Sequence, residues 1–407
     1  MNNLTAADLT VIFNAVLFVI LLAVAILLIR RIRQRRTALN QPANSTQVAF
    51  PFPQGQVDRE RQMLPTQPEE ELDKEIRVAY RDWLSIYLLP DAEPGRAFLR
   101  TGVARNWMRY QVTATSFSQA LAMLVSVLVA GEDPQAQAQF DRILAFCLSH
   151  SSANAPDLMS WQVMPDVVPG RRLDADLNAE PWIAFALLAA QAQWGRSERF
   201  QYEILARRRL EALLPLYQQA AQTEPQALVY SPTFYQLFAH VTAEQAWKAI
   251  DDSLAAQGKA QWSGTHAKFN ADNSSEEAKL GLSILQLGIA ELEQAGKPTG
   301  KLTGEVEKRV RESVAQLARA ELLDESALHI EPEGFSSLSL LACCTPAVLC
   351  LNDQALVDQQ WQALILAKPG QHDPIGATLR LLSLMQLSGN IWFDKVMWNE
   401  LPPSPKG

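Results

Sequence analysis

The sequence is poor in the features that mark nucleic-acid-binding, metal-binding and disulfide-stabilised proteins. Its formal net charge is −8 and its pI is about 5.3, whereas a nucleic-acid-binding domain usually carries a basic face. The four cysteines form no CxxC pair, and the five histidines complete no zinc-ligand spacing. We therefore expect no cofactor, no metal ion and no nucleic-acid partner. No stretch alternates like a convincing strand, so the sequence predicts an all-α protein.

A long hydrophobic run occupies residues 11–29, VIFNAVLFVILLAVAILLI, in which only Asn14 is polar. At about 1.5 Å per residue the run would span roughly 28 Å, enough for a bilayer core. No basic residue precedes it and no small-residue cleavage site follows it, which argues against a cleaved signal peptide. The sequence thus predicts a single-pass membrane anchor over residues 1–36. The alternative is a buried helix of a soluble domain.

Composition divides the rest of the chain into three parts. Residues 37–74 are rich in Pro, Gln and Asn without an apolar period, as expected of a linker. Its acidic run Glu69–Asp73 would start a helix, because negative charge suits the N-terminal dipole. Residues 75–398 form the predicted body, and residues 399–407 are a tail.

About twelve amphipathic helices are predicted in the body from apolar residues at three- and four-residue spacing. They could form a closed double ring of helical hairpins or an open solenoid, which periodicity cannot distinguish. The predicted segments are Ala79–Leu89, Ser116–Ala130, Gln139–Cys147, Pro181–Trp194, Tyr202–Tyr217, Thr233–Val241, Ala243–Ala255, Glu276–Gln294, Val306–Ala320, Ser336–Leu349, Ala355–Ala367 and Ile375–Leu387.

The most informative stretch is Arg171–Trp194, RRLDADLNAEPWIAFALLAAQAQW, in which Asp174 and Asp176 precede a long apolar run. An Asp just before such a run is typical of a helix N-cap. A carboxylate at the mouth of a buried helix could alternatively face a cleft. Both readings stay open from the residues alone.

Four stretches in the same order resemble glycoside hydrolase family 8, the bacterial cellulases and endoglucanases. DADLNAEPWIAFALLAAQAQW is similar to the family segment DADL-x-I-A-x-ALL-x-A-x-x-W, and SFSQALAMLVSVLVAGED is similar to SEG-x-x-YGM-L-x-x-V-x-x-GD. VYSPTFYQLFAHV is similar to NPSYF-x-P-x-x-Y-x-x-FA, and NSSEEAKLGLSIL occupies the place of YDA-x-R-x. The resemblance implies an (α/α)6 barrel of six inner and six outer helices.

The resemblance also implies an inverting mechanism, in which one carboxylic acid protonates the leaving oxygen and an opposite carboxylate activates water. Alignment on Met123 places Phe117 where the family has its acidic Glu, so the general acid is lost. Glu277 falls where the family has its base Asp. Asp174 and Asp176 remain as the residues of the cleft-lining segment, so the catalytic candidates are Asp174, Asp176 and Glu277.

Aromatic residues in or near the matched stretches are candidates for sugar binding, because aromatic faces stack on apolar sugar faces. Each is equally open to a reading as a core residue. Ser116 and Gln119 fit a capping box that would place Phe117 in the first helical turn. The candidates are Trp107, Tyr110, Phe117, Trp161, Tyr230 and Tyr235.

These observations favour a membrane-anchored, non-catalytic cellulase-like protein that serves as an accessory or scaffold in exopolysaccharide production. Its expected partners are a β-glucan or a polysaccharide synthase subunit. The alternatives are an inverting endo-β-1,4-glucanase with a rearranged acid and base, and a body that binds only protein. The five arginines directly after the hydrophobic run predict a bacterial inner-membrane protein with a cytosolic body, whereas the family resemblance implies a periplasmic one.

Overall fold

The computed structural model describes residues 48–54, 63–106, 109–165, 172–224, 228, 232–262 and 336–393. The chain divides into two units, Met1–Gln47 and Val48–Gly407, and the described residues all lie in the second. Among them no helix is long and apolar enough to cross a bilayer. The predicted span 11–29 and the predicted helices Glu276–Gln294 and Val306–Ala320 lie outside the described residues.

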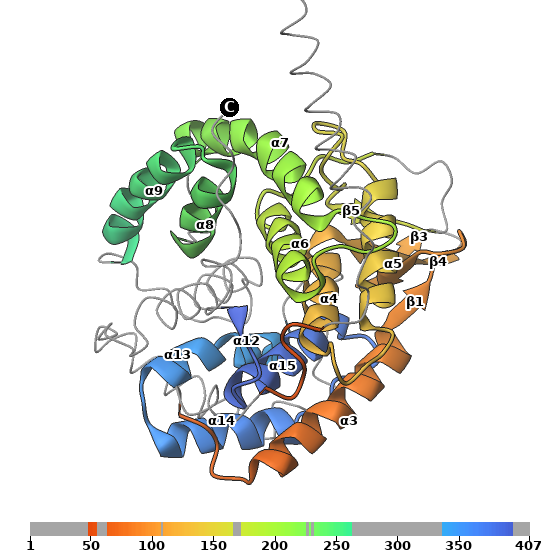
Figure 1. Ribbon diagram of the computed structural model, residues 1–407, viewed down its shortest axis with the longest axis vertical. Helices are drawn as coiled ribbons and strands as arrows, with labels where there is room; N and C mark the ends of the chain where they lie inside the picture. Colours follow the sequence, from red (N-terminus) through yellow and green to blue (C-terminus); the bar gives the residue numbers. More distant parts are fainter. Residues whose placement is uncertain are drawn as a thin grey trace, which may run out of the picture. The chain divides into compact units, whose positions relative to one another are not determined.

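Two layers of helices build the described part of the body, so the helical prediction is confirmed in its main feature (Figure 1). The inner layer is nearly buried on all sides, whereas the outer helices alternate buried and exposed residues. The inner helices are α4 (Ser116–Leu128), α6 (Glu180–Trp194), α8 (Pro232–Thr242), α12 (Ser337–Cys343) and α15 (Pro374–Leu387). The outer helices are α3 (Glu69–Tyr87), α5 (Ala136–Ser149), α7 (Tyr202–Thr223), α9 (Ala246–Trp262) and α14 (Gln354–Leu366), with the short α13 (Thr345–Cys350) between α12 and α14.

Helix α4 lies at the centre of the packing. All of its residues are buried, and it packs against α5, α6 and α15. Its capping box is formed by Thr115 and Ser118, since the Thr115 side chain accepts from the Ser118 N–H and Ser118 accepts from the Thr115 N–H. The box predicted at Ser116 and Gln119 is therefore wrong by one residue. Gln119 instead bonds Leu99 through both ends of its amide, which ties α4 to the strand of residues Ala97–Leu99.

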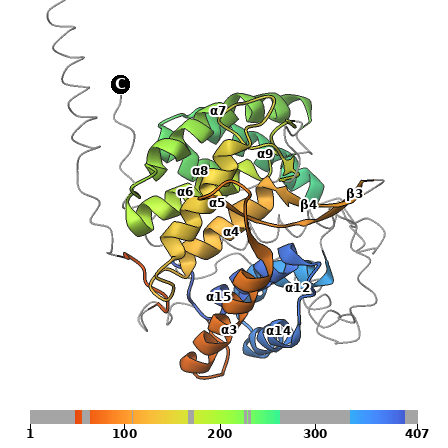
Figure 2. The ribbon, with the colours of Figure 1, turned by 90° about the vertical axis from the view of Figure 1, so that its right-hand side faces the viewer.

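Two small antiparallel sheets contradict the prediction of an all-α chain. Strand β1 (Leu88–Pro90) pairs with β2 (Ala97–Leu99), and β4 (Arg109–Thr115) lies between β3 (Gly102–Asn106) and β5 (Gln162–Val163). The hairpin β3–β4 extends from the start of α4 (Figure 2). Strands of two to seven residues are too short to show a clear alternation of apolar and polar residues, which explains why the pattern missed them.

Consecutive inner and outer helices run in opposite directions, which gives the body two distinct ends. At one end lie the starts of α4 and α6 and the long loop of residues 150–179 between α5 and α6; we call this the site end. The other end holds the last turns of α4 and α6 and the short connections of residues 129–135 and 195–201. The long connections lie at the site end, and binding and catalytic residues are most often found on such loops.

Part of the predicted linker packs on the body at the end opposite the site. The segment Val48–Gln54, which we call the strap, buries Phe52 to 4% exposure and stacks Phe50 on Trp392 with ring centroids 4.3 Å apart. Further along, the Thr66 N–H donates to Asp358 over 2.7 Å. Helix α3 begins at Glu69, as the acidic run predicts, which is six residues before the predicted start of the body.

Candidate functional site

Backbone hydrogen bonds at the site end bring three of the predicted site residues together. The Ser116 N–H donates to the Trp161 carbonyl over 3.0 Å, and the Trp161 N–H donates to the Asp174 carbonyl over 2.9 Å. The start of α4 with Phe117, strand β5 and the Asp174 loop thus lie side by side. Segments that are far apart in sequence therefore meet at this end.

The two aspartates of this loop differ in environment. Asp174 is exposed, whereas Asp176 is partly buried and its carboxylate accepts from the Asn178 N–H over 2.9 Å. Burial raises the pKa of Asp176, and its bonds to the Asn178 and Ala179 backbone counteract that rise in part. Asp176 also accepts, through its carbonyl, from the N–H groups of Ala179 and Glu180. It therefore organises the turn that leads into α6, close to the capping role predicted for one of the aspartates.

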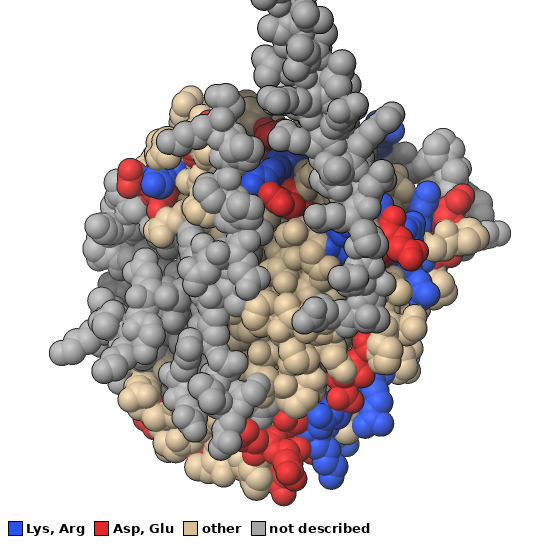
Figure 3. Space-filling view, in the orientation of Figure 1, with Lys and Arg blue, Asp and Glu red and all other residues tan. Residues whose placement is uncertain are grey.

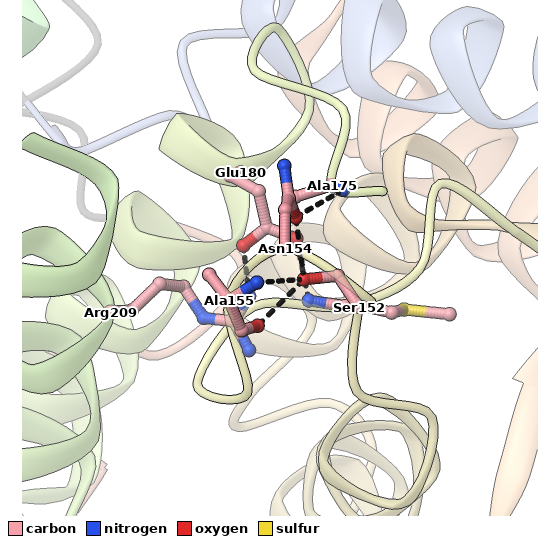
Figure 4. Close-up of polar contacts among 7 residues, drawn as sticks. Ser152, Asn154, Ala155, Ala175, Glu180 and Arg209 are labelled. Atoms are coloured by element: carbon pink, nitrogen blue, oxygen red, sulfur yellow. Dashed lines mark hydrogen bonds and ion pairs between the residues drawn. The ribbon is translucent and has the colours of Figure 1, made fainter. Parts of the chain in front are cut away.

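A buried ion pair lies directly behind this turn. Glu180 begins α6 with no exposed surface, and its carboxylate accepts from the Met159 N–H over 2.9 Å and pairs with Arg209 of α7, which is 2% exposed (Figure 4). Burial raises the pKa of Glu180, and the Arg209 guanidinium opposes the rise. A carboxylate at a helix start is further stabilised by the helix dipole. With both charges shielded from solvent, this carboxylate is not presented to a ligand.

The loop before Asp174 is fixed by its own hydrogen bonds. The Ser152 hydroxyl bonds the Ala155 carbonyl over 2.6 Å and accepts from the Ala155 N–H over 3.1 Å. The Asn154 side chain accepts from the Ala175 N–H over 3.0 Å, which joins the two halves of the loop (Figure 4). Neighbouring Ser160 donates to the Ser151 carbonyl over 3.0 Å. Asp174 and Trp161 thus project from a backbone that is held on both sides.

The predicted aromatic candidates separate into core and surface residues. Phe117 is only 9% exposed and belongs to the hydrophobic core, whereas Trp161 is partly exposed. Tyr235 is 1% exposed and stacks on Trp247 with centroids 6.4 Å apart. The hydroxyl of its neighbour Tyr217 donates to the Leu177 carbonyl over 2.7 Å, which ties the segment after Asp174 to helix α7.

The other predicted site residues contribute no described side chain. Trp107, Tyr230 and Glu277 lie outside the described residues. Tyr110 is placed by its backbone alone, in β4 opposite Arg105. Among the residues that the structure describes, no group of three or more His, Cys, Asp or Glu side chains could hold a metal ion.

Sequence reasoning missed Glu180, although the motif spacing contained the signal. In the family pattern one residue separates DADL from the following Ile-Ala, whereas five residues, Asn178–Trp182, lie between Leu177 and Ile183 here. Counting back from the helical part of the motif places Asn178–Pro181 at the DADL positions, with Glu180 at the second aspartate. In this register the family's carboxylate position is occupied by the residue that Arg209 neutralises.

Comparisons with known proteins agree with this picture of the fold. No protein-family profile matches the chain. An endoglucanase from Bacillus sp. (strain KSM-330) is 31% identical over 168 residues, 39% of this chain and 36% of the relative. A beta-glucanase from Niallia circulans is 28% identical over 155 residues, 37% of this chain and 36% of the relative. The matched part thus spans little more than a third of either relative.

Solved structures extend the likeness to most of the body. A β-1,3-1,4-glucanase from Paenibacillus sp. X4 superposes with a TM-score of 0.61 at 16% identity, covering 81% of this chain and 96% of that one. A cold-adapted family 8 xylanase superposes with a TM-score of 0.59 at 15% identity, covering 86% and 98%. The body therefore has the helical fold of the family 8 (α/α)6 barrels. The resemblance inferred from the sequence is confirmed as a similarity: part of the chain is similar in sequence to a bacterial endoglucanase, and the body is similar in fold to family 8 enzymes.

Proposed function

We propose that the chain is a membrane-anchored, non-catalytic relative of the family 8 glucanases, an accessory or scaffold protein of bacterial exopolysaccharide production. The observation that carries this proposal is the state of two positions at the site end. Phe117, which the sequence resemblance aligns with the family's general acid, is buried, and the Glu180 carboxylate is paired with Arg209 out of contact with solvent. A general acid typically contributes about 10²–10⁴-fold to a reaction rate. A core phenyl ring cannot supply the proton.

The ligand that fits the remaining surface is a β-glucan such as cellulose. Trp161 offers a partly exposed indole and Asp174 an exposed carboxylate, which are the groups that stack on sugar rings and accept from sugar hydroxyls. A synthase subunit is the second expected partner. The described faces visible in Figure 3 mix acidic and basic side chains around an uncharged centre, in keeping with a partner other than nucleic acid.

Turnover and binding measured on the same full-length preparation test the proposal. We expect no reducing sugar from soluble β-1,4-glucans and from mixed-linkage glucans, together with calorimetric binding to cello-oligosaccharides. Trp161→Ala should weaken that binding, whereas the exposed control Asp157→Ala, in the same loop, should leave it unchanged. Steady turnover by the unsubstituted chain would overturn the non-catalytic part of the proposal.

A second candidate function is an inverting endo-β-1,4-glucanase with a rearranged acid, and the raised pKa of Asp176 favours it. A carboxyl group that keeps its proton above its usual range is suited to general-acid catalysis. Asp176→Asn would then abolish turnover. The control Asp174→Asn, two positions earlier and exposed, would retain turnover and the geometry of the loop. Absence of turnover in the parent chain rejects this candidate.

Membrane anchoring and sidedness belong to the same proposal and need a separate test. The hydrophobic run of residues 11–29 and the arginines after it support a single-pass anchor in the bacterial inner membrane, with the body on the cytosolic side. Fusion of a phosphatase or a fluorescent protein to the C-terminus distinguishes the two sides. Phosphatase activity without fluorescence would place the body in the periplasm and would favour exported glucan over a cytosolic protein partner.

A further inference from the structure

Two buried tyrosines from different helices are joined to the backbone of the site end. Tyr217, on the inner face of α7, is 1% exposed, and its hydroxyl donates to the Leu177 carbonyl over 2.7 Å. Tyr235, in the first turn of α8, is 1% exposed and is hydrogen-bonded to the Tyr217 hydroxyl. A phenol has a single proton to donate. Because Leu177 receives the proton of Tyr217, Tyr235 is the donor between the two hydroxyls.

Aromatic packing fixes the direction in which the Tyr217 hydroxyl points. The rings of Tyr217 and Tyr235 meet edge to face with centroids 6.0 Å apart. Both pack on Trp247 of α9, which has no exposed surface, with centroid distances of 5.6 Å for Tyr217 and 6.4 Å for Tyr235. Helices α7, α8 and α9 thus lie together and supply one ring each (Figure 1). Rings packed in this way have little freedom to turn.

The Leu177 carbonyl belongs to the loop that carries both aspartates of the site end. Asp176 closes a turn on the backbone that follows it. Before that turn, the Asp174 carbonyl accepts from the Trp161 N–H over 2.9 Å. These bonds hold the loop to its own neighbours, whereas the bond at Leu177 holds it to the outer helix α7. The position of the loop on the body therefore depends in part on Tyr217.

The surroundings of Tyr217 also keep its hydroxyl protonated. Burial raises the pKa of Tyr217 well above its usual value, and Tyr235, Asp176 and Glu180 act in the same direction. A phenolate could not donate to a carbonyl oxygen. The bond to Leu177 is therefore available at neutral pH and well above it.

We propose that Tyr217, supported by Tyr235, is a positioning residue of the candidate site, and that its bond to Leu177 holds the loop where Asp174 and Trp161 meet a β-glucan. The inference rests on the proposed function for the identity of the ligand. Without the bond the loop samples other conformations, and a ligand binds only the fraction of molecules with the loop in place. The sequence placed Tyr235 among the residues that bind sugar directly, whereas here it acts through Tyr217.

Tyr217→Phe and Tyr202→Phe are matched substitutions, since each removes one hydroxyl from a buried ring of α7. The Tyr202 hydroxyl, in the first turn of α7 and toward the other end of the body, donates to the buried Asp141 over 2.7 Å. We expect Tyr217→Phe to weaken calorimetric binding of cellohexaose to the full-length chain by about three- to tenfold, the factor that corresponds to one buried hydrogen bond. Tyr202→Phe should lower the unfolding midpoint at least as much, yet leave the affinity unchanged.

Tyr235→Phe tests the support that Tyr217 receives. It should weaken cellohexaose binding less than Tyr217→Phe does, because the bond to Leu177 remains. In the Tyr217→Phe background it should add nothing, since the bond that it supports is already lost. Tyr235→Phe also carries the test if Tyr217→Phe yields no folded protein, and an unchanged affinity in Tyr235→Phe would then overturn the inference.

Hydrogen exchange of the ligand-free chain measures the loop itself without any sugar. We expect the amides of residues 172–180 to exchange several-fold faster in Tyr217→Phe than in the parent chain and in Tyr202→Phe. Exchange in α4 should stay the same in all three proteins. A general loss of stability would instead speed exchange in every helix.

The outcomes separate this inference from the proposed function. A parent chain that binds no cellohexaose overturns the glucan-binding part of the proposed function, and faster exchange of the loop in Tyr217→Phe then still supports the positioning of the loop. Unchanged exchange over residues 172–180 in Tyr217→Phe overturns the positioning role. Faster exchange with an unchanged affinity, or an equal loss of affinity in Tyr202→Phe, overturns the role of Tyr217 in ligand binding.

Discussion

The ion pair of Arg209 and Glu180 removes a carboxylate from the chemistry available at the site end, because both charged groups are buried away from water. Removing one partner of a buried pair leaves an uncompensated charge, which is far more costly than the net worth of the pair. The sequence pattern pointed to Asp174 and Asp176 instead, since those two occur in the literal string DAD. The register of helix α6, together with burial, identifies Glu180 as the carboxylate at the family's second aspartate position. A local motif cannot show this burial, because the partner Arg209 lies 29 positions later in the chain.

Arg209→Gln should destabilise the body by about 3–5 kcal/mol at neutral pH, because Glu180 is left charged and buried. Urea denaturation of the full-length chain in detergent measures the change. The control Arg208→Gln alters the exposed neighbour on the same helix and should stay within about 0.5 kcal/mol. Equal effects of the two substitutions would show that the Glu180 pair contributes nothing specific.

Asp176→Asn should alter how stability depends on pH. Because the folded-state pKa of Asp176 is raised, the folded protein holds this proton more tightly than the unfolded chain does. The contribution of Asp176 to stability therefore falls as pH rises from its unfolded pKa, about 3.9, through the folded pKa, and is constant above that. Asn at this position removes the dependence and can still accept from the Asn178 N–H.

Denaturation curves of the parent chain and Asp176→Asn at a series of pH values give the measurement. The variant should gain stability relative to the parent as pH rises through this window. Asp174→Asn serves as the control, because that carboxylate is exposed. Parallel curves for the parent and Asp176→Asn would contradict the raised pKa.

At the scale of the element, α4 shows what local sequence can and cannot predict. Its apolar run predicts a helix and its core position, and the structure ends it at Leu128, two residues before the predicted end. Its cap was assigned to the wrong pair, since Thr115, Ser116 and Ser118 are all acceptable N-cap residues and only the path of the incoming strand β4 selects Thr115. The short strands escaped prediction for a related reason, because their pairing partners, not their own pattern, define them.

Thr115→Ala should cost about 1 kcal/mol, because the Ser118 N–H loses its acceptor at the start of a buried helix. Thr115→Ser keeps the hydroxyl and should retain most of that stability. Thermal unfolding of both variants beside the parent gives the comparison. A Thr115→Ser variant as unstable as Thr115→Ala would assign the loss to packing of the methyl group and not to the cap.

For the whole molecule, the division into linker and body depends on tertiary contacts that composition cannot report. The segment of residues 37–74 reads as a linker because it lacks an apolar period, yet Phe50 and Phe52 are packed within it. Two aromatic side chains in a Pro-rich stretch are too few to predict a docked segment. Their partners, Ala130, Gln193 and Trp392, come from three separate regions of the chain. The helical fold, in contrast, was predictable because each helix carries its own repeat.

A chain beginning at residue 48 should therefore be more stable than one beginning at residue 69, although both contain every described helix. Burial of Phe52 alone is worth about 1.5–3 kcal/mol, and the bonds of the strap to Ala130 and Gln193 add to it. Hydrogen exchange should show faster amide exchange near Trp392 and the last turns of α4 and α6 in the shorter chain, with little change at the site end. Identical melting temperatures and exchange patterns would mean that the strap rests on the body without stabilising it, and residues 37–68 would then act as a linker throughout.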